Sequence, residues 1–106
     1  MAVASYKSPV APPPVAAQIA EVTVDIKTGE VRVGKLVTAV DGGIIVNPTL
    51  ASGQVEGAMA QALGYAVCEE MPYQANGQPL VHHLSDYHIF AADEMPELIT
   101  RFVETV

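Results

Sequence analysis

Two runs of β-branched residues on either side of a short polar stretch constrain the fold most. The first run occupies residues 18–26 and the second residues 31–40, and both alternate partly between apolar and polar side chains. Such runs favour β-strands. The stretch between them, residues 27–30, contains Gly29, which can adopt a positive φ without steric cost. The sequence therefore predicts a β-hairpin.

A helical pattern follows the hairpin. Asn47 is a plausible N-cap and Pro48 is tolerated at the first helical position. From there to about Glu70, apolar residues recur every four positions, so one broad apolar face is expected. The face consists of Val55, Met59, Leu63 and Val67, widened by Ala58, Ala62 and Ala66.

Three glycines interrupt this predicted helix, namely Gly53, Gly57 and Gly64. Each costs about 1 kcal/mol relative to alanine in a helix. Three such costs in one helix indicate that a backbone or a ligand comes close to it. The glycines are the first indication of a binding site.

The remainder of the chain gives weaker signals. Residues 73–79 contain an Asn-Gly pair and predict a turn, whereas residues 80–89 allow at most one short strand. Residues 91–97 resemble a single helical turn, and residues 98–106 alternate well enough to form a final strand. The predicted fold class is α+β: a hairpin, then a long helix packed on a small sheet, then a last strand.

The N-terminal segment is of a different kind. Residues 8–15 read SPVAPPPV, and their four prolines fix φ and remove backbone donors. We expect an extended proline-rich arm over residues 1–17, which would lie on a neighbouring surface, and an α+β unit over residues 18–106.

Composition excludes several classes of protein. The net charge is −7 and the chain has no Lys/Arg cluster, which disfavours nucleic-acid binding. No apolar run approaches the roughly 18 to 20 residues of a membrane helix, and the start does not resemble a secretory signal. The only cysteine, Cys68, cannot form an internal disulfide, so a cytoplasmic location is expected. Apolar residues make up 50% and charged residues only 16%, so part of the surface should be covered by protein.

The segment from residue 40 to residue 70 carries a resemblance to a known family. An aspartate-glycine strand end, an Asn-Pro step and the helix start Gln54-Val55-Glu56-Gly57 follow in this order. This order is similar to the second molybdopterin-binding region of the xanthine dehydrogenase and aldehyde oxidase family, the molybdenum hydroxylases. Residues 12–18 resemble the family's entry to this region and residues 86–97 its exit. The resemblance covers about residues 5 to 104.

The resemblance implies a molybdenum-molybdopterin cofactor, whose own dithiolene sulfurs hold the metal. Gln54 matches the family position that contacts the pterin, and Gly53 and Gly57 would let the pterin approach the helix. A glutamine amide donates and accepts hydrogen bonds without adding charge to an anionic cofactor. Gln61 lies two helical turns later and is a secondary candidate. The alternative for Gln54 is that it only caps or solvates the first turn.

The chain also departs from the family. Gly43 and Ile44 occupy a place where a more polar pair is common. The family's catalytic glutamate lies in a glycine-rich loop downstream of the last strand, and the chain stops at Val106 before it. An upstream glycine-phenylalanine loop is missing as well. The three acidic residues Glu94, Glu97 and Glu104 are in no matching context, so no catalytic residue is assigned.

Other polar residues have ordinary structural explanations. Glu56 suits the first turn of a helix, and Asp41 is either a turn former or a support for the cofactor loop, the former being favoured. A metal site is not predicted, because adjacent histidines on a strand point to opposite faces and no fourth ligand is well spaced. The histidines are His82, His83 and His88. Cys68 is expected to be a small, buried apolar group.

The sequence is thus interpreted as a piece of the molybdopterin-binding subunit of a molybdenum hydroxylase, which hydroxylates an aldehyde or N-heterocycle with water as the oxygen source. Its partners would be the remainder of that subunit and iron-sulfur and FAD subunits or domains. The isolated chain is expected to fold around its hairpin and helix, to bind no cofactor, to be inactive and to self-associate. The alternative is a non-catalytic interaction module that docks on a partner chain.

Overall fold

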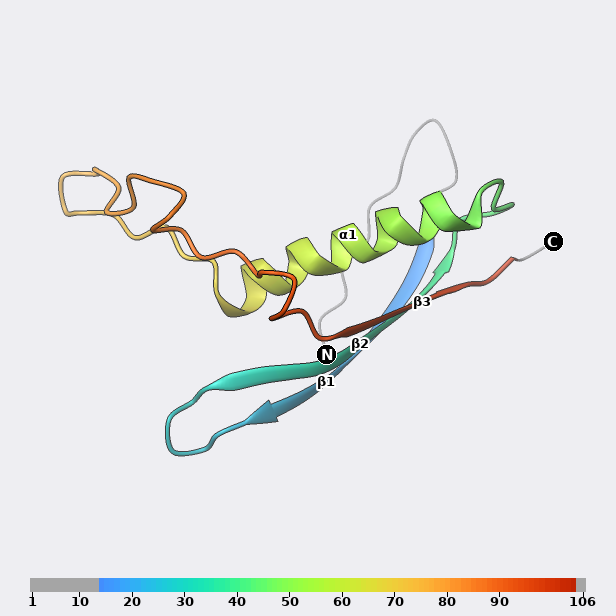
Figure 1. Cartoon of the computed structure of the whole chain (residues 1–106), viewed down its shortest axis with the longest axis horizontal. Coiled ribbons are helices and arrows are strands. Elements are labelled where there is room, and N and C mark those ends of the chain that lie inside the picture. The colour runs from blue at the N-terminus through green and yellow to red at the C-terminus, as the bar shows by residue number, and fades with distance from the viewer. Residues whose placement is uncertain (1–13, 105–106) are drawn as a thin grey trace.

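The computed structural model describes residues 14–104, which form a three-stranded sheet with one helix on one face (Figure 1). The elements are β1 (Val15–Val24), β2 (Val31–Asp41), α1 (Pro48–Val67) and β3 (Glu97–Phe102). The strand order is β1-β2-β3. The predicted α+β class, with a hairpin, a long helix, a small sheet and a final strand, is confirmed.

The hairpin of β1 and β2 is antiparallel. In its turn, an Asp25 carboxylate oxygen accepts hydrogen bonds from the Lys27 amide at 2.8 Å and the Thr28 amide at 3.3 Å, and Gly29 has φ of 79°. Asp25 thereby takes itself and Ile26 out of the first strand, which ends two residues before the predicted limit.

At its other end β1 begins earlier than predicted. Val15, Ala16 and Ala17, the last residues of the expected proline-rich arm, pair with Asp41, Val40 and Ala39 of β2. Residues 1–13, most of the expected arm, lie outside the described residues. The strand extends this far because β2 continues to Asp41 and offers partners for the backbone of β1.

The start of α1 agrees with the prediction, but its end does not. The Asn47 side chain accepts a hydrogen bond from the Leu50 amide at 3.1 Å, and Pro48 is the first helical residue. The helix ends at Val67, three residues before the predicted Glu70. The Cys68 backbone leaves the helical region with φ of −135°, so the following amides turn back toward the last turn of the helix.

Strand β3 is parallel to β2, with Leu98 opposite Leu36 and Phe102 opposite Val40. It spans residues 97–102, so it begins one residue before the predicted range of 98–106 and ends at Phe102, and residues 105–106 of that prediction lie outside the described residues. Because a parallel pair needs a crossover, the chain runs from β2 through α1 and a long connection before it returns to the sheet. On the outer face of the sheet, the Lys35 ammonium contacts the Glu97 carboxylate at 3.0 Å.

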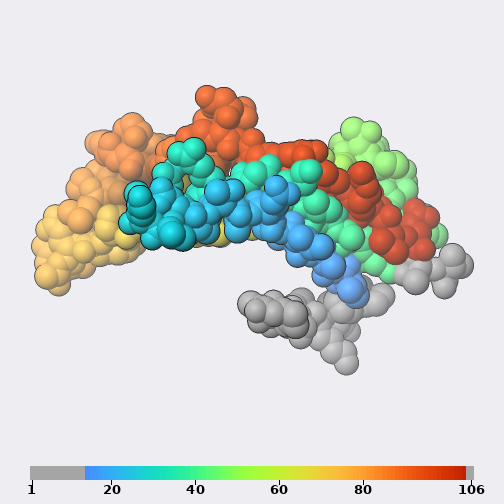
Figure 2. Space-filling model, turned by 90° about the horizontal axis from the view of Figure 1, so that it is seen from below, coloured from blue at the N-terminus to red at the C-terminus, as the bar shows by residue number. Residues whose placement is uncertain are grey.

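The connection from residue 68 to residue 96 has little regular structure. Tyr73 and Pro79 form an isolated antiparallel bridge around the predicted Asn-Gly turn, where Gly77 has φ of 82°. No strand forms in residues 80–89, and a single turn follows, in which the Glu94 amide donates to the Ala91 carbonyl oxygen at 3.1 Å. Figure 2 shows this connection, in yellow and orange, extending one end of an elongated molecule.

The core is small. Leu36 of β2 and Met59 and Leu63 of α1 are its buried members, and partly buried side chains surround them. These neighbours are Val33, Val55, Phe90 and Leu98. Buried Thr38 extends the core: its hydroxyl accepts a hydrogen bond from the Gln18 amide at 2.7 Å and donates one to the Met59 sulfur at 2.9 Å. Of the predicted apolar face of the helix, only the central residues Met59 and Leu63 are therefore buried in the core.

Much apolar surface stays exposed. The chain has an accessible area of 8583 Å², against about 5,700 Å² expected for a folded monomer of its mass. Its radius of gyration is 17.1 Å, against about 13 Å for a compact domain of this length. Both strands of the hairpin contribute exposed valines, with Val22 at 51% and Val31 at 40% exposure. The expectation that protein covers part of this surface fits both values.

Met59→Ala should remove most of the stability of the chain. Truncating a buried methionine costs about 2 to 5 kcal/mol, and here the Thr38 hydroxyl also loses its acceptor. Urea unfolding followed by circular dichroism measures the effect, with Met71→Ala as the matched control because Met71 is 43% exposed. Equal destabilisation by the two variants would contradict the assignment of the core.

Candidate functional site

Gln54 lies in the second turn of α1, with an exposed side chain at the end of a groove between the helix and the hairpin. The groove has a volume of about 420 Å³, and Gln18 and Thr38 line its sheet side. Within residues 14–104 the Gln54 amide makes no hydrogen bond. Its donor and acceptor are therefore both available to a ligand.

Gly53 and Gly57 flank Gln54, and the space beside both is open. A Cβ atom built on either glycine would meet nothing within 4 Å. The described residues therefore do not supply the close neighbour that the sequence predicted. The exposed backbone would instead admit a group that approaches from outside this part of the chain.

Gln61 is exposed on α1 but does not share a groove with Gln54. Its amide donates a hydrogen bond to the Tyr65 hydroxyl at 3.0 Å, and it lines a separate depression with Tyr87 and Phe90. Seven residues of helix place the two glutamines in similar directions, but each meets a different neighbour: the hairpin for Gln54 and the connection for Gln61. The structure does not bring the predicted pair together in one pocket.

A cluster at the C-terminal end of α1 was not predicted from the sequence. The Tyr87 hydroxyl donates a hydrogen bond to the Glu69 carboxylate at 2.7 Å, which together with burial raises the pKa of Tyr87 to about 12. The Glu69 and Cys68 amides both donate to the Gly64 carbonyl oxygen, at 2.8 and 3.1 Å. The Glu69 side chain folds back over Gly64, where a Cβ atom would collide with it.

The sequence signal for this cluster is Gly64, one turn before the end of the helix. It is ambiguous, because a glycine at such a position has several explanations. Cys68, expected to be buried, is partly buried, and its thiol lies 3.9 Å from the His88 carbonyl oxygen. Burial raises the pKa of this thiol, with a smaller contribution from the Glu69 charge. It therefore has the environment of a structural cysteine.

The remaining acidic candidates have partners in the structure. Asp41 accepts a hydrogen bond from the Gly43 amide at 3.1 Å, which is the geometry of a turn former. Glu56 accepts one from the Ser52 hydroxyl at 3.0 Å. Glu94 binds the Ala91 amide at 2.8 Å and Glu104 contacts the Ile45 amide at 3.4 Å. The first three contacts are local, whereas the last joins the end of the described chain to the loop before α1.

The histidines do not gather with other ligands. His82 and His83 are exposed, and His88 lies 3.4 Å from a Glu94 carboxylate oxygen. Within residues 14–104, no three His, Cys, Asp or Glu side chains are placed to hold a metal ion. In the same part of the chain, no helix has the length and hydrophobicity to span a bilayer.

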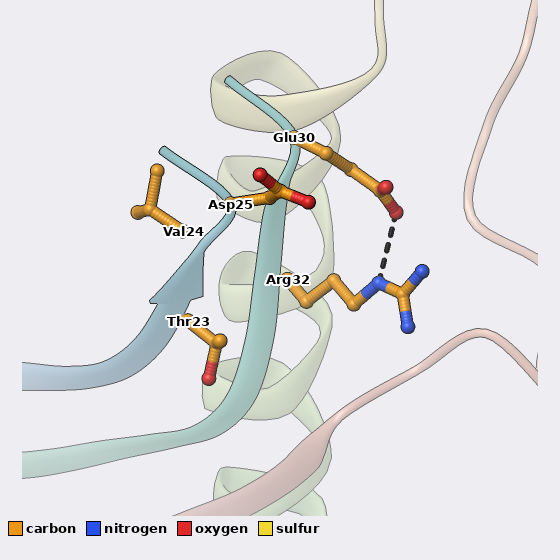
Figure 3. Close-up of a pocket in the computed structure, with 5 residues that line it drawn as sticks. All are labelled: Thr23, Val24, Asp25, Glu30 and Arg32. Carbon is orange, nitrogen blue, oxygen red and sulfur yellow. Dashed lines mark hydrogen bonds and ion pairs between the residues drawn. The ribbon is translucent and has the colours of Figure 1, made fainter. Parts of the chain in front are cut away.

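Another depression lies at the turn of the hairpin (Figure 3). It is lined by Thr23, Val24 and the charged side chains of Asp25, Glu30 and Arg32. The Arg32 guanidinium contacts the Glu30 carboxylate at 2.8 Å, and this hydrogen bond raises the pKa of Arg32. Asp25 caps the turn. Two of the three charged side chains thus pair with each other and the third is bonded to the turn, all in an exposed setting, and Gln54 has the better site for a ligand.

Comparison with known proteins identifies the family. The profile of the molybdopterin cofactor-binding domain matches residues 2–96. The chain belongs to this family. The resemblance to the xanthine dehydrogenase and aldehyde oxidase family, and with it the expectation of a molybdenum-molybdopterin cofactor, is confirmed.

Two relatives come from Escherichia coli (strain K12). The probable hypoxanthine oxidase XdhD is 43% identical over 83 residues, which are 78% of this chain and 9% of that protein. The putative xanthine dehydrogenase molybdenum-binding subunit XdhA is 36% identical over 101 residues, which are 94% of this chain and 13% of that protein. The chain thus spans about a tenth of the length of these relatives.

Solved structures agree with the fold. Quinoline 2-oxidoreductase from Pseudomonas putida 86 matches with a TM-score of 0.76 and 34% identity, over 83% of this chain and 11% of that one. The Cu,Mo-CO dehydrogenase matches with a TM-score of 0.80 and 27% identity, over 87% of this chain and 12% of that one. Several relatives are subunits of larger enzymes, among them the nicotine 6-hydroxylase large subunit of Paenarthrobacter nicotinovorans.

The residues near Gln54 fit a molybdopterin cofactor. The amide has no partner within residues 14–104, and the helix backbone at Gly53 and Gly57 is open to a planar ring. The groove carries no like charge that would repel an anionic ligand, because its polar side chains are Gln18, Thr38 and Gln54. No side chain here needs to coordinate the metal, since the cofactor's own sulfurs do so.

Gly64→Ala tests the cluster at the end of α1. In a Tyr87→Phe background, alanine should stabilise the chain by about 1 kcal/mol through its helix propensity. In the wild-type background the gain should be clearly smaller, because the new methyl group displaces Glu69 from Tyr87. Urea unfolding of the four proteins of this double-mutant cycle measures the difference. Identical effects in both backgrounds would show that Gly64 and Tyr87 are not coupled through Glu69.

Proposed function

We propose that the chain is part of the molybdopterin-binding subunit of a molybdenum hydroxylase and that Gln54 contacts the pterin. The unpaired amide of Gln54 beside two open glycines, in a chain of the molybdopterin cofactor-binding family, carries this proposal. A pterin edge offers both donors and acceptors, and the amide complements both kinds of group. Gly53 and Gly57 allow the ring to approach the helix backbone.

Gln61 is a second candidate for cofactor contact. Its amide nitrogen already donates to the Tyr65 hydroxyl, so its carbonyl oxygen is the atom that a ligand would use. The depression that it lines lies on the connection side of α1. Gln61 would therefore touch a different part of the cofactor from Gln54, and both contacts require a ligand that extends along two turns of the helix.

The bound cofactor would supply the chemistry, which in the parent enzyme is hydroxylation of an aldehyde or N-heterocycle with water as the oxygen source. This chain would bind and orient the cofactor. Two of the four glutamates weighed above contact neighbours in the sequence and two contact distant segments, and we propose no catalytic role for any of them. The catalytic glutamate of the parent would come from another segment of the same subunit.

The partners follow from the same proposal. They are the remainder of the molybdopterin-binding subunit and iron-sulfur and FAD subunits or domains, in the cytoplasm. The chain alone would bind no cofactor, because a pocket must enclose its ligand and the groove at Gln54 is open. Its exposed apolar surface would make it self-associate.

A non-catalytic interaction module is the competing function, and the exposed apolar surface favours it. Gene context distinguishes the two. A reading frame that continues past Val106 into a glycine-rich loop with a glutamate supports the enzyme. A stop codon at that point, with no neighbouring subunit gene, supports the module.

Gln54→Ala in the parent enzyme should lower molybdenum content. A ligand group left without its partner typically costs about 1 to 3 kcal/mol, which corresponds to roughly 5- to 150-fold weaker retention of the cofactor. Metal analysis per purified subunit measures this. Gln74→Ala is the matched control, because Gln74 is an exposed glutamine in the turn of the connection. Full molybdenum occupancy with normal turnover would remove Gln54 from the site.

Gly57→Val should reduce cofactor content and activity more than it reduces thermal stability. The position is open in the described residues, so the chain itself has room for the side chain, whereas a pterin against the helix would not. Gly57→Ala is the companion variant. If the valine enzyme stays active while alanine raises the melting temperature, Gly57 is an ordinary weak point of the helix.

A further inference from the structure

Helix α1 covers only part of the sheet. It packs on β3 and β2, and no Cα atom of α1 lies within 8 Å of a Cα atom of β1 (Figure 1). The face of β1 on the helix side therefore has no covering element among residues 14–104. Its side chains, at every second position, are Ala16, Gln18, Ala20 and Val22.

This face forms one wall of a continuous apolar groove. The depression that contains Gln54 adjoins another depression, which lies between the hairpin and the second half of α1 and is distinct from the one in Figure 3. Gln18 and Ala62 line both the Gln54 depression and this neighbouring one. The opposite wall is α1, through the alanines of its predicted stripe, Ala58, Ala62 and Ala66, all of them exposed. Among the residues that line it, the polar side chains are Gln18 and Thr38, which are bonded to each other, and Gln54 at one end.

The dimensions of the groove suit a helix. Neighbouring strands lie about 4.8 Å apart, so β1 is displaced by about 10 Å from β3. Packed helices lie about 8 to 10 Å apart, and alanines at the contact favour the short end of that range. A helix placed beside α1 would therefore lie above β1. Three strands covered by two helices complete a two-layer α/β arrangement.

We propose that an amphipathic helix from the remainder of the molybdopterin-binding subunit docks in the part of this groove toward the hairpin turn, against β1 and the α1 residues Ala62 and Ala66, which leaves the end at Gln54 open to the cofactor. This inference rests on the proposed function, since it places the chain within a larger subunit. The occupant must present large apolar side chains at helical spacing, because the alanines on both walls leave room for them. It carries no charge on that stripe, since the groove has no charged partner for one.

Two observations favour this occupant over a second copy of the chain. The relatives are about ten times longer than the matched segment, so most of their length is available to cover it. A copy has only α1 to offer among its described residues. Met59 and Leu63 of α1 are buried in its own core. The exposed large apolar residues of α1 are Leu50, Tyr65 and Val67, and they do not recur at the three- or four-residue spacing of a helical stripe.

The area of exposed surface is also sufficient. The chain exposes about 2,900 Å² more than a folded monomer of its mass, whereas a stable protein interface buries about 1,600 Å² in total from both partners. A single docked helix therefore uses only part of this excess. The outer face of the sheet, with exposed Ile19, remains for other contacts.

Site-directed cross-linking in the parent subunit tests the proposal. Cys68 is replaced by serine, Ala62→Cys places a thiol in the groove, and Thr28→Cys at the exposed hairpin turn is the control. Thiol labelling with a maleimide should be on the order of 100-fold slower at Ala62→Cys than at Thr28→Cys, because the Ala62→Cys thiol becomes accessible only when the docked helix opens locally. Benzophenone attached to Ala62→Cys after reversible unfolding should cross-link to one segment of the same polypeptide with apolar residues at helical spacing. Ala66→Cys serves if Ala62→Cys fails to fold.

Mass spectrometry of a mixture of ¹⁵N-labelled and unlabelled subunit identifies the occupant. A cross-link within one polypeptide supports the proposal. A mixed-isotope cross-link shows a second copy in the groove and overturns it, as does labelling as fast as at Thr28→Cys. Molybdenum content, measured on the same protein without cysteine substitutions in the groove, reports separately on the proposed function. If the enzyme contains molybdenum but the Ala62→Cys thiol is labelled rapidly, the docked helix is contradicted and the proposed function is not.

Discussion

The contact between Met59 of α1 and the β2 side chains Leu36 and Thr38 is the interaction on which the rest of the structure depends. It is the point where helix and sheet are buried together, and Met59 is the most completely buried large side chain described. The Thr38 hydroxyl links the methionine sulfur to Gln18 of β1, so the contact connects the hairpin to the helix. With so small a core, the orientation of α1, and with it the position of Gln54, rests on few side chains.

The sheet is built from contacts of very different sequence range. The hairpin is local and is closed by the Asp25 turn. Strand β3 arrives through a long crossover and joins β2 in parallel, which requires loop closure before any pairing is gained. The Glu69–Tyr87 hydrogen bond shortens that loop by tying the connection to the end of α1. At Gly64 the Glu69 side chain occupies the space that a Cβ atom would take.

The site at Gln54 consists of what the chain leaves open. The amide has no partner within residues 14–104, two glycines expose the helix backbone, and the groove beside them lacks a covering element. In a complete domain such features would be costly, because exposed apolar area and helical glycines both lower stability. The matched segment spans about a tenth of the length of these relatives. The proposal that these surfaces meet the cofactor and neighbouring parts of a larger subunit gives a physical reason for both features.

The sequence by itself determined the local elements and the family. The β-branched runs around Gly29 determined the hairpin, Asn47 and Pro48 the start of the helix, and the Gln54 motif the molybdopterin-binding region. These features depend on residues close together in the chain. The tertiary structure decided the end of α1 at Val67, the parallel pairing of β3 and the separation of Gln61 from Gln54. Each of these depends on which distant segment packs against the helix, and a pattern of nearby residues does not specify that choice.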